Sequence, residues 1–283
     1  MKDLSIIIVN FNNRKLLEEC LDSIYQSTLK ISFEIIVVDN GSTDGSQSMV
    51  KTKYPNVNLI ENKENLGFAK ASNQGLKIYK GRYAMLLNND TIVKDHAFDL
   101  MVDFMDKNLQ IGACGPKLLN VDGTIQHQGS LFGKKFWRST EPTTVDFIVG
   151  ACLMARRETI DRIGLLDENL YFYNDDLDWC LRIKKAGYKI YYLPDAQVVH
   201  YGGYSSKRVF NRRLFVEGFR GGLYFCRKHY GNIAFYLYKL LLLLGIIIYL
   251  PLFILSYPLK REKFVDRLFA CIDILNICFT HFD

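Results

Sequence analysis

Two apolar runs in the first hundred residues each end in polar residues that could bind part of a nucleotide. The first run covers residues 34–38 and is followed by Asp39, Asn40, Gly41, Ser42, Thr43, Asp44 and Gly45. The Asp39 carboxylate can accept the N3–H of a uracil or thymine ring, a donor that cytosine lacks at that position. Glycine lets the backbone turn tightly, and the residues from Ser42 to Asp44 can cap a following helix. A plain turn with a helix cap is the alternative, and we expect Asp44 to act only as that cap.

The second run, residues 83–87, ends in Asn88-Asn89-Asp90-Thr91. One carboxylate at such a point can hold a divalent cation against a diphosphate, because Mg²⁺ and Mn²⁺ bind through few protein oxygens plus phosphate and water. An ordinary turn is the alternative here too. His200 ends the apolar stretch 196–199. If the fold brings it near Asp90, it becomes a candidate metal ligand or phosphate donor.

A third group of acids begins a predicted helix within LYFYNDDLDWCLRIKKAG, residues 170–187. Its first turn contains Asp175, Asp176 and Asp178, and Gly187 ends it. Acidic side chains at a helix N-terminus are favoured by the helix dipole alone, so a purely structural role is one interpretation. The functional interpretation is a general base, a carboxylate that takes a proton from a hydroxyl group.

Alternating strands and helices must position these residues. The pattern predicts strands at 4–10, 34–39, 57–61 and 83–88, and helices at 13–27, 44–53, 67–79 and 95–107. Continuously apolar strands alternating with helices indicate a parallel sheet covered on both faces, an α/β fold. Ligands of such sheets lie beyond the carboxyl ends of the strands, which is where the candidate residues fall. Residues 120–145 are predicted to form a hairpin or a mobile loop region.

The last third of the chain has a different character. Residues 201–283 contain 12 Lys and Arg against 5 Asp and Glu, whereas residues 1–200 contain 24 against 25. The twenty residues 240–259 carry no charge, and such a helix would span about 30 Å, the thickness of a bilayer core. We expect membrane association, either as a span or, because Pro251 disfavours a straight helix, as a re-entrant or in-plane hairpin. A buried core helix is the alternative.

The closing stretch 264–282 places Phe264, Leu268, Ile272, Leu275 and Phe279 at helical spacing. This pattern is typical of an interfacial amphipathic helix, or of a helix packed on the N-terminal part of the chain. We find no signal peptide, because the apolar run 6–9 is short and is followed at once by asparagines. The N-terminal part is therefore expected at the cytoplasmic face of the membrane.

Composition and missing motifs exclude several classes of protein. The apolar and charged fractions, 49% and 23%, are ordinary for a globular chain, and the seven scattered cysteines contain no CxxC pair. This argues against a disordered protein, a zinc cluster and a disulfide framework. The sequence contains no P-loop, no GxGxxG after a strand, no HExxH and no GxSxG. We expect no nucleic-acid partner, because the excess positive charge accompanies the apolar tail.

Seven sequence stretches are informative together because of the order in which they follow one another. They are SIIIVNFN (5–12), VVDNGSTDGS (37–46), ENLGFAKASNQG (64–75), MLLNNDT (85–91), VGACLMARRETIDRIGLLDENLYFYNDDLDWCLRIKKAGY (149–188), VVHYGGYS (198–205) and FCRKHYG (225–231). Together they resemble glycosyltransferase family 2, and within it the rhamnosyltransferase-like branch. The resemblance covers about residues 4–231 and implies a GT-A fold, a Rossmann-like and mostly parallel sheet with helices on both faces. We predict this domain over 1–231 and a membrane-associated segment over 232–283.

The resemblance also implies roles for individual residues. Asp39 would be the base-binding carboxylate, and Asp90 would be the last carboxylate of the family's metal-binding DxD motif. The first position of that motif is Asn88 here, which leaves one acidic ligand. Asp176 would be the catalytic residue of the family's acidic run. The remaining assignments are Asn10, Phe11, Asn65, Gly67, Asn73 and Asn89 on the donor side, His200 beside the metal and diphosphate, and Gly150, Ala151 and Asp175 on the acceptor side.

The implied reaction is an inverting transfer from a UDP- or dTDP-sugar, with dTDP-rhamnose favoured by the resemblance. Asp176 would deprotonate a hydroxyl of a glycan or lipid-linked acceptor in surface polysaccharide synthesis, and Mg²⁺ or Mn²⁺ at Asp90 would carry charge on the leaving diphosphate. An inactive scaffold that binds nucleotide sugars is the alternative that Asn88 leaves open. A sugar-1-phosphate nucleotidyltransferase is disfavoured, because its Gly/Arg-rich loop is missing between residues 10 and 20.

Overall fold

The computed structural model describes residues 2–27, 29–128, 135–171, 173–202, 212–255 and 264–279. The chain divides into two compact units. Unit 1 contains Met1–Glu168 and Asp175–Gly202, and unit 2 contains Asn169–Asn174 and Gly203–Asp283. This division lies before the domain boundary predicted at residue 231, because the helix that crosses residue 231 begins at Arg212.

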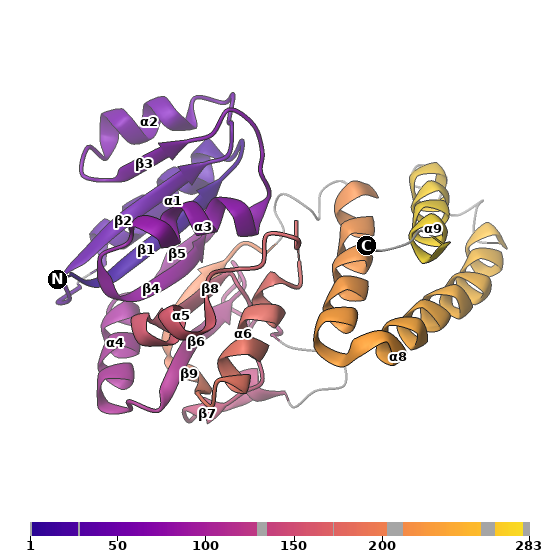
Figure 1. Cartoon of the computed structure of the whole chain (residues 1–283). Coiled ribbons are helices and arrows are strands. Elements are labelled where there is room, and N and C mark those ends of the chain that lie inside the picture. The colour runs from indigo at the N-terminus through magenta and orange to yellow at the C-terminus, as the bar shows by residue number, and fades with distance from the viewer. Residues whose placement is uncertain are drawn as a thin grey trace. The chain divides into compact units, whose positions relative to one another are not determined.

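Unit 1 is built on a mixed sheet in the order β3-β2-β1-β4-β8-β6-β9-β5, with β7 also paired to β9 (Figure 1). Strands β1 to β4 are parallel to one another, as predicted, and β6 is parallel to β9. Antiparallel pairing joins β8 to β4 and β6, and joins β5 and β7 to β9. The strands are β1 (Lys2–Asn10), β2 (Phe33–Asp39), β3 (Asn58–Glu61), β4 (Gly81–Asn88), β5 (Thr91–Val93), β6 (Ile111–Leu119), β7 (Thr143–Thr144), β8 (Cys152–Arg156) and β9 (Lys189–His200).

Helices cover both faces of this sheet, which explains the continuous apolar runs in its central strands β1, β2 and β4. One face packs on α1 (Arg14–Gln26), α2 (Ser46–Lys53) and α4 (Ala97–Lys107), and the other on α3 (Phe68–Ile78), α5 (Arg157–Ile163) and α6 (Asp175–Lys185). In β1, Ile6 and Ile8 belong to the first core and Ile7 to the second, since successive side chains of a strand point to opposite faces. The eight strands and helices predicted over residues 4–107 are present, each within a few residues of its predicted bounds.

The predicted loop region 120–145 is only partly described, since residues 129–134 lie outside the described residues. On either side of them, Leu119 pairs with Ile125, a short 3₁₀ helix covers Phe136–Arg138, and β7 follows. Trp137 of the 3₁₀ helix is buried, and its carbonyl accepts a hydrogen bond from the Tyr192 hydroxyl. The described part of this region is therefore tied to the sheet.

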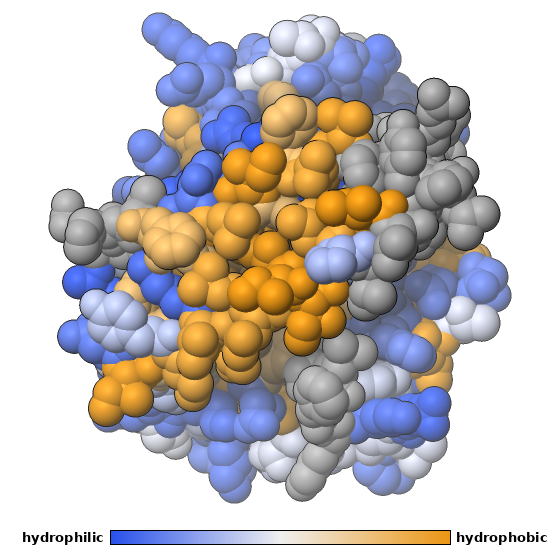
Figure 2. Space-filling model, turned by 90° about the vertical axis from the view of Figure 1, so that its right-hand side faces the viewer, coloured by the Kyte–Doolittle hydropathy of each residue, from blue (hydrophilic) through white to orange (hydrophobic). Residues whose placement is uncertain are grey.

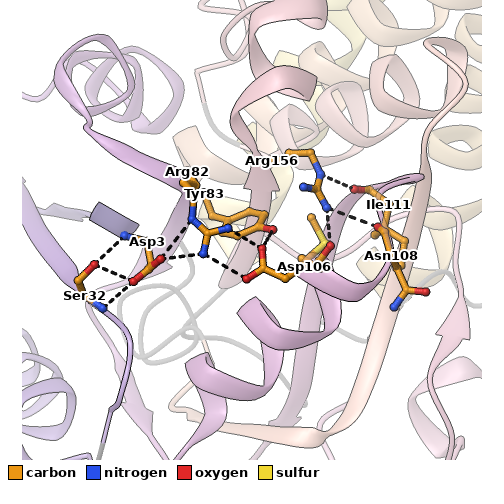
Figure 3. A network of polar contacts seen from close by, with 9 residues as sticks. Asp3, Ser32, Arg82, Tyr83, Asp106, Asn108, Ile111 and Arg156 are labelled. Carbon is orange, nitrogen blue, oxygen red and sulfur yellow. Dashed lines mark hydrogen bonds and ion pairs between the residues drawn. The ribbon is translucent and has the colours of Figure 1, made fainter. Parts of the chain in front are cut away.

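A network of charged side chains joins strands at the edge of the sheet where β1 and β4 begin (Figure 3). Arg82 donates to Asp3 at 2.7 Å and to Asp106 at 2.6 Å, and the Tyr83 hydroxyl also donates to Asp106. Arg156 donates to the backbone carbonyls of Met105, Asn108 and Ile111. The network connects β1, β4, β8 and α4, and we interpret it as structural because it lies at the edge opposite the carboxyl ends of β1 and β4.

The described residues of unit 2 include the helices α8 (Arg212–Leu255) and α9 (Phe264–Phe279). Gly231 breaks α8 with φ 78° and ψ −172°, whereas Pro251 lies inside the helix. The residues Arg212–Pro251 are long and apolar enough to cross a membrane by length and composition, and 11% of their most apolar window is buried. This low buried share disfavours the alternative of a buried core helix for this segment.

Candidate active site

Three parallel strands bring the predicted residues into a row at one edge of the sheet, which we call the carboxyl edge. Asn10 is the last residue of β1 and lies in register with Asp39, the last residue of β2. On the other side of β1, Val9 lies in register with Asn88, the last residue of β4. The row exists because parallel strands of a covered sheet end at the same edge.

The Asp39 carboxylate is buried and held by three donors. Its Oδ1 accepts from the Ser42 backbone N–H at 2.8 Å and from the Gln47 amide at 2.7 Å, and its Oδ2 accepts from the Asn10 amide at 3.0 Å. A carboxylate has about four acceptor sites, so Asp39 keeps capacity for one more donor such as a base N–H. Phe11, directly after Asn10, is 46% exposed at this edge.

The turn after Asp39 depends on the close approach of two backbones. Gly41 has φ +83°, and a Cβ at this position would lie 2.9 Å from the Cα of Glu64. Asp44 accepts from the backbone N–H groups of Ser46 and Arg14, at the starts of α2 and α1. It therefore caps the predicted helix α2 and also holds α1.

Asn65 and Gly67 are connected to the Asp39 turn through Asn40, which was not predicted as a site residue. The buried Asn40 amide donates to Asn65 Oδ1 at 3.1 Å and to the Gly67 carbonyl at 3.2 Å. Asn65 Oδ1 also accepts from the Gly67 N–H at 3.0 Å, and Gly67 adopts φ +85° where α3 begins.

Asn73 is used differently from the other predicted donor residues. Its amide nitrogen donates to the Leu166 carbonyl at 2.9 Å and to Glu168 at 3.0 Å, and its oxygen accepts from the Leu166 N–H at 3.0 Å. These bonds fasten the loop after α5 to α3. Both ends of the amide are thus engaged by protein groups.

The Asn88-Asn89-Asp90 turn extends the row from β1 to β9. The Asn89 amide donates to Asn10 Oδ1 at 2.7 Å, so Asn89 lies beside the Asp39 cluster. After the turn, β5 runs antiparallel to β9 and pairs its first residue, Thr91, with the last residue of β9, His200. The Nε2 atom of His200 is 3.3 Å from Asp90 Oδ1 and 3.3 Å from the Asn88 amide nitrogen. The fold therefore brings His200 near Asp90, the arrangement that makes His200 a candidate metal ligand or phosphate donor.

Gln126 fixes the orientation of the His200 ring, and no motif indicated it. Gln126 Oε1 lies 2.8 Å from His200 Nδ1, while its amide nitrogen donates to Asn120 Oδ1 at 3.2 Å and to the His200 carbonyl at 3.4 Å. Since the amide nitrogen faces two acceptors, the amide oxygen must face Nδ1 and accept its proton. Gly202 makes room for this contact, because a Cβ there would lie 2.6 Å from the Gln126 amide nitrogen.

This arrangement suits a divalent cation bound together with phosphate. With Nδ1 as donor to Gln126, the Nε2 of a neutral ring presents a lone pair toward Asp90, and two such acceptors face one another favourably only across a cation or a proton. Two ligands on adjacent positions of an octahedral ion, at about 2.1 Å each, lie roughly 3 Å apart, close to the separation seen here. The described residues contain no cluster of three or more His, Cys, Asp or Glu side chains for a metal, so an ion here would take its other ligands from substrate and water.

The acidic pair at the start of α6 is joined to the carboxyl edge by the loop before β8. Asp176 Oδ2 accepts from the Gly150 N–H at 3.0 Å, and its Oδ1 accepts from the Leu177 N–H at 2.8 Å. The next residue of the loop, Ala151, accepts at its carbonyl from the Asn88 N–H at 2.9 Å. One short loop thus contacts both the Asn88-Asn89-Asp90 turn and the predicted base.

The two carboxylates differ in their surroundings. Burial raises the pKa of Asp176, and burial together with the charge of Asp176 raises the pKa of Asp175 well above its usual range. Asp176 is partly exposed, whereas Asp175 is 6% exposed. The third acid of the run, Asp178, is buried in an ion pair with Arg182, which in turn donates to the carbonyls of Ile163 and Leu165. Asp178 is therefore structural.

Comparison with known proteins identifies this arrangement. A model of the family described as Glycosyl transferase family 2 matches residues 5–164, more than half of the chain. The chain belongs to glycosyl transferase family 2. It is similar to an N-acetylglucosaminyl-diphospho-decaprenol L-rhamnosyltransferase of Mycobacterium tuberculosis, with 25% identity over 72% of this chain and 78% of that protein.

Solved structures show the same fold. GalNAc-T7 with UDP, GalNAc and Mn²⁺ matches 78% of this chain and 47% of its own, with a TM-score of 0.60 and 19% identity. A mannosyltransferase of Pyrobaculum calidifontis, in complex with GDP-Man and Mn²⁺, matches 98% of this chain and 88% of its own, with a TM-score of 0.58 and 18% identity. The protein is a glycosyltransferase of family 2 with a GT-A fold: a mixed sheet with helices on both faces.

Proposed function

We propose that this glycosyltransferase moves a sugar from a UDP- or dTDP-sugar to a hydroxyl of a glycan or lipid-linked acceptor, with inversion at the anomeric carbon. The observation that carries this proposal is the continuous polar row from Asp39 through Asn10, Asn89 and Asp90 to His200. Rhamnose from dTDP-rhamnose is favoured because the Mycobacterium tuberculosis relative is named a rhamnosyltransferase. The same name, with its decaprenol diphosphate, favours a lipid-linked acceptor in surface polysaccharide synthesis.

In this proposal the base of the donor lies at Asp39, beside Asn10 and Phe11. The three protein donors around Asp39 hold its carboxylate in one orientation, so that its last acceptor site selects a ring with an N3–H. Asn65 and Gly67 shape the donor side of this pocket through Asn40. Asn73 serves the site indirectly, by holding the loop that leads toward α6.

The diphosphate of the donor would lie beside Asp90 and His200, which would hold Mg²⁺ or Mn²⁺. Such an ion, when bound, supplies positive charge that stabilises the leaving diphosphate. The protein's own part is to keep the His200 Nε2 lone pair directed at this place through Gln126, and to keep Asn88 and Asp90 fixed by the β5–β9 pairing.

Asp176 acts as the general base and Asp175 supports it. Asp176 accepts two backbone N–H bonds, which favour its charged form, whereas the more deeply buried Asp175 keeps its proton. The acceptor oxygen forms a bond to the anomeric carbon, the bond to the diphosphate breaks, and the hydroxyl proton goes to Asp176. Gly150 and Ala151 lie on the acceptor side, between Asp176 and Asn88.

We further propose that unit 2 places the enzyme on the cytoplasmic face of a membrane, where a lipid-linked acceptor is available. Support comes from the exposed apolar helix and from the excess of basic residues in 201–283. The segment Asn169–Asn174, directly before Asp175, belongs to unit 2, and the Asn174 amide donates to the Gly218 carbonyl of α8 at 3.1 Å. Membership of the transferase family disfavours the nucleotidyltransferase alternative, and the retained Asp176 argues against an inactive scaffold.

A donor screen tests this proposal. Detergent-purified protein is mixed with Mg²⁺ or Mn²⁺ and a panel of UDP- and dTDP-sugars, and thermal stabilisation and released nucleotide are recorded. We expect one donor to stabilise the protein and to be hydrolysed slowly, and we expect Asp176→Asn to abolish turnover but keep the stabilisation.

Other outcomes discriminate among the alternatives. Stabilisation without turnover, even with membrane extract as acceptor, would support the scaffold. If no pyrimidine nucleotide binds, the Asp39 assignment is wrong. If Asp176→Asn loses donor binding, the role of Asp176 as base is wrong.

A further inference from the structure

The helix that follows the apolar segment packs against residues on both sides of the Gly231 break. One core of unit 2 contains Val216 and Leu223 from the first part of α8, and Phe235 and Ile246 from the second part. The α9 residues of the same core are Ala270, Cys271, Ile274, Ile277 and Cys278. Residues before and after the uncharged stretch 240–259 therefore share one core.

An ion pair also joins α9 to the first residue of α8. Arg212 donates from Nε and from a terminal nitrogen to the two carboxylate oxygens of Asp273, at 2.6 Å each. This two-point geometry is the strongest form of an arginine–carboxylate contact. Arg212 precedes the apolar stretch by almost thirty residues and Asp273 follows it.

A single crossing of the bilayer is incompatible with these contacts. If residues 240–259 spanned once, Asp273 would lie across about 30 Å of hydrocarbon from Arg212. The first part of α8 cannot enter the bilayer beside it, because it contains Arg212, Arg213, Glu217, Arg220, Arg227 and Lys228. The described contacts of α9 therefore require both ends of the apolar stretch to be on one side.

The second part of α8 nevertheless presents an apolar stripe to its surroundings. The stripe repeats at helical spacing on the side opposite Phe235, Leu242 and Ile246, and Figure 2 shows hydrophobic side chains gathered on one face. Its exposed members are Ile233, Tyr236, Leu237, Leu240, Leu241, Leu244, Ile247, Ile248 and Ile254. On α9, Val265, Phe269, Ile272 and Phe279 are exposed as well.

The residues predicted to form one apolar face of α9 therefore differ in their exposure. Ile272 and Phe279 are exposed, Leu275 is partly buried, and the packed face is built from smaller residues and the isoleucines of the shared core. Within unit 2, α9 packs on α8. An amphipathic helix with one face outward agrees with the exposed residues.

We propose that α8 and α9 lie in the plane of one leaflet and do not cross the bilayer, so that the C-terminus is on the same side as unit 1. This inference rests on the proposed membrane association. A bilayer suits the stripe better than a second copy does, because exposed tyrosines and Lys239 accompany it and because Lys260, Arg261 and Lys263 follow directly in the sequence.

Protease accessibility in sealed vesicles tests the topology. The full chain, with a different cleavable tag at each terminus, is reconstituted so that the N-terminal tag faces outward. We expect protease to remove both tags at similar rates without detergent. Protection of the C-terminal tag until detergent is added would overturn the proposal while leaving membrane association intact. If the protein does not float with vesicles at all, both the membrane association and the in-plane arrangement fail.

A pair of variants tests the face itself. Leu241→Glu with Ile248→Glu places two charges on the stripe, and we expect at least about a tenfold drop in binding to vesicles containing anionic lipid. Ile78→Glu, at an exposed apolar residue of α3 in unit 1, is the matched control and is expected to bind like the parent. Equal vesicle binding by the stripe variant and the parent would overturn the proposal, and so would a dimer of the parent that the stripe variant converts to a monomer in vesicle-free buffer.

Discussion

The adjacent carboxylates of Asp175 and Asp176 receive unequal support from the protein. Asp176 is bound by the N–H groups of Gly150 and Leu177, and Asp175 is buried with its neighbour's charge against it. Because two such groups do not ionise independently, the pair is expected to carry one proton near neutral pH. The negative charge then resides on Asp176, whose carboxylate already accepts two backbone N–H groups.

This inequality predicts the pH dependence of the reaction. A base must be deprotonated to work, and burial raises the pKa of Asp176, so transfer should fall on acidification at a pH clearly above the ordinary aspartate value of 3.8. A kcat/KM profile from pH 4.5 to 8 measures this. Asp176→Asn is expected to lower kcat by about 10²–10⁴-fold or more and to remove the acid limb. A parent profile that is flat across this range contradicts the assignment.

Gln126 is predicted to act as a positioning residue for the metal side. Gln126→Leu keeps the size of the side chain but removes the acceptor for His200 Nδ1, so the ring is no longer held with Nε2 toward Asp90. We expect Mn²⁺ affinity, measured by electron paramagnetic resonance in the presence of the nucleotide that stabilises the protein, to weaken by about tenfold or more.

Two further variants distinguish this role from a general loss of structure. Gln126→Glu retains an acceptor and should bind Mn²⁺ within about threefold of the parent. Thr124→Ala, in the same loop, should leave Mn²⁺ affinity unchanged. Equal weakening in all three variants would mean that the loop matters and the Gln126 acceptor does not.

At the scale of elements, the connections after the parallel strands build the site. The turn after β2 carries Asp39, closes against Glu64 at Gly41, and reaches Gly67 through Asn40. Each of these contacts joins residues about 25 positions apart, because each βα unit returns its chain to the same edge of the sheet. A change in one turn therefore reaches the neighbouring turn.

A variant of Asn73 tests whether this residue supports the fold and does not bind the donor. Its amide holds Leu166 and Glu168, so Asn73→Ala should lower the free energy of unfolding by about 1–3 kcal/mol, since buried backbone partners lose their bonds. Donor affinity should change by less than about threefold. Thermal unfolding and donor titration measure the two quantities, with Lys77→Ala on α3 as control. A tenfold loss of donor affinity at unchanged stability would instead support the prediction that Asn73 contacts the donor.

For the chain as a whole, the two ends of the strands in the sheet have different roles. The carboxyl edge collects the polar row, whereas the edge where β1 and β4 begin is joined by the Arg82 network (Figure 3). Hydrogen bonds from Ser32 and Arg82 lower the pKa of Asp3 to about 2, and Arg82 also lowers the pKa of Asp106. A lowered pKa means that these groups stabilise the fold above about pH 4 and lose that contribution as the pH falls toward 2.

Replacement of Arg82 should therefore affect stability and spare binding. Arg82→Met is expected to lower the free energy of unfolding by about 1 kcal/mol at pH 7, because a side chain that is 37% exposed is screened by solvent. The loss should be smaller at pH 3, where the carboxylates begin to gain protons. Chemical unfolding at both pH values measures this, and donor affinity should not change. A larger loss at pH 3 than at pH 7 contradicts the interpretation.

Much of unit 1 was predictable because its signals are local. The period and length of the apolar runs distinguish strand from helix. A strand that is covered on both faces carries a continuous apolar run, as β1 does at residues 6–9. Parallel strands end at a common edge, so the residues directly after them, such as Asp39 and Asn88, could be selected before their contacts were known. Asp44 could likewise be expected to cap a helix, since that interaction spans two residues.

The order of strands and helices in unit 1, and the polar residues at the strand ends, could thus be predicted from local patterns. Which of those residues contact one another depends on how the chain packs. His200 reaches Asp90 because β5 pairs with β9, Gln126 reaches His200 from a loop without a motif, and Asn73 holds Leu166. The contact of Arg212 with Asp273 likewise depends on how helices pack. These contacts join residues 61 to 110 positions apart. Packing and hydrogen-bond satisfaction of the whole chain select them, and no local sequence pattern indicates them.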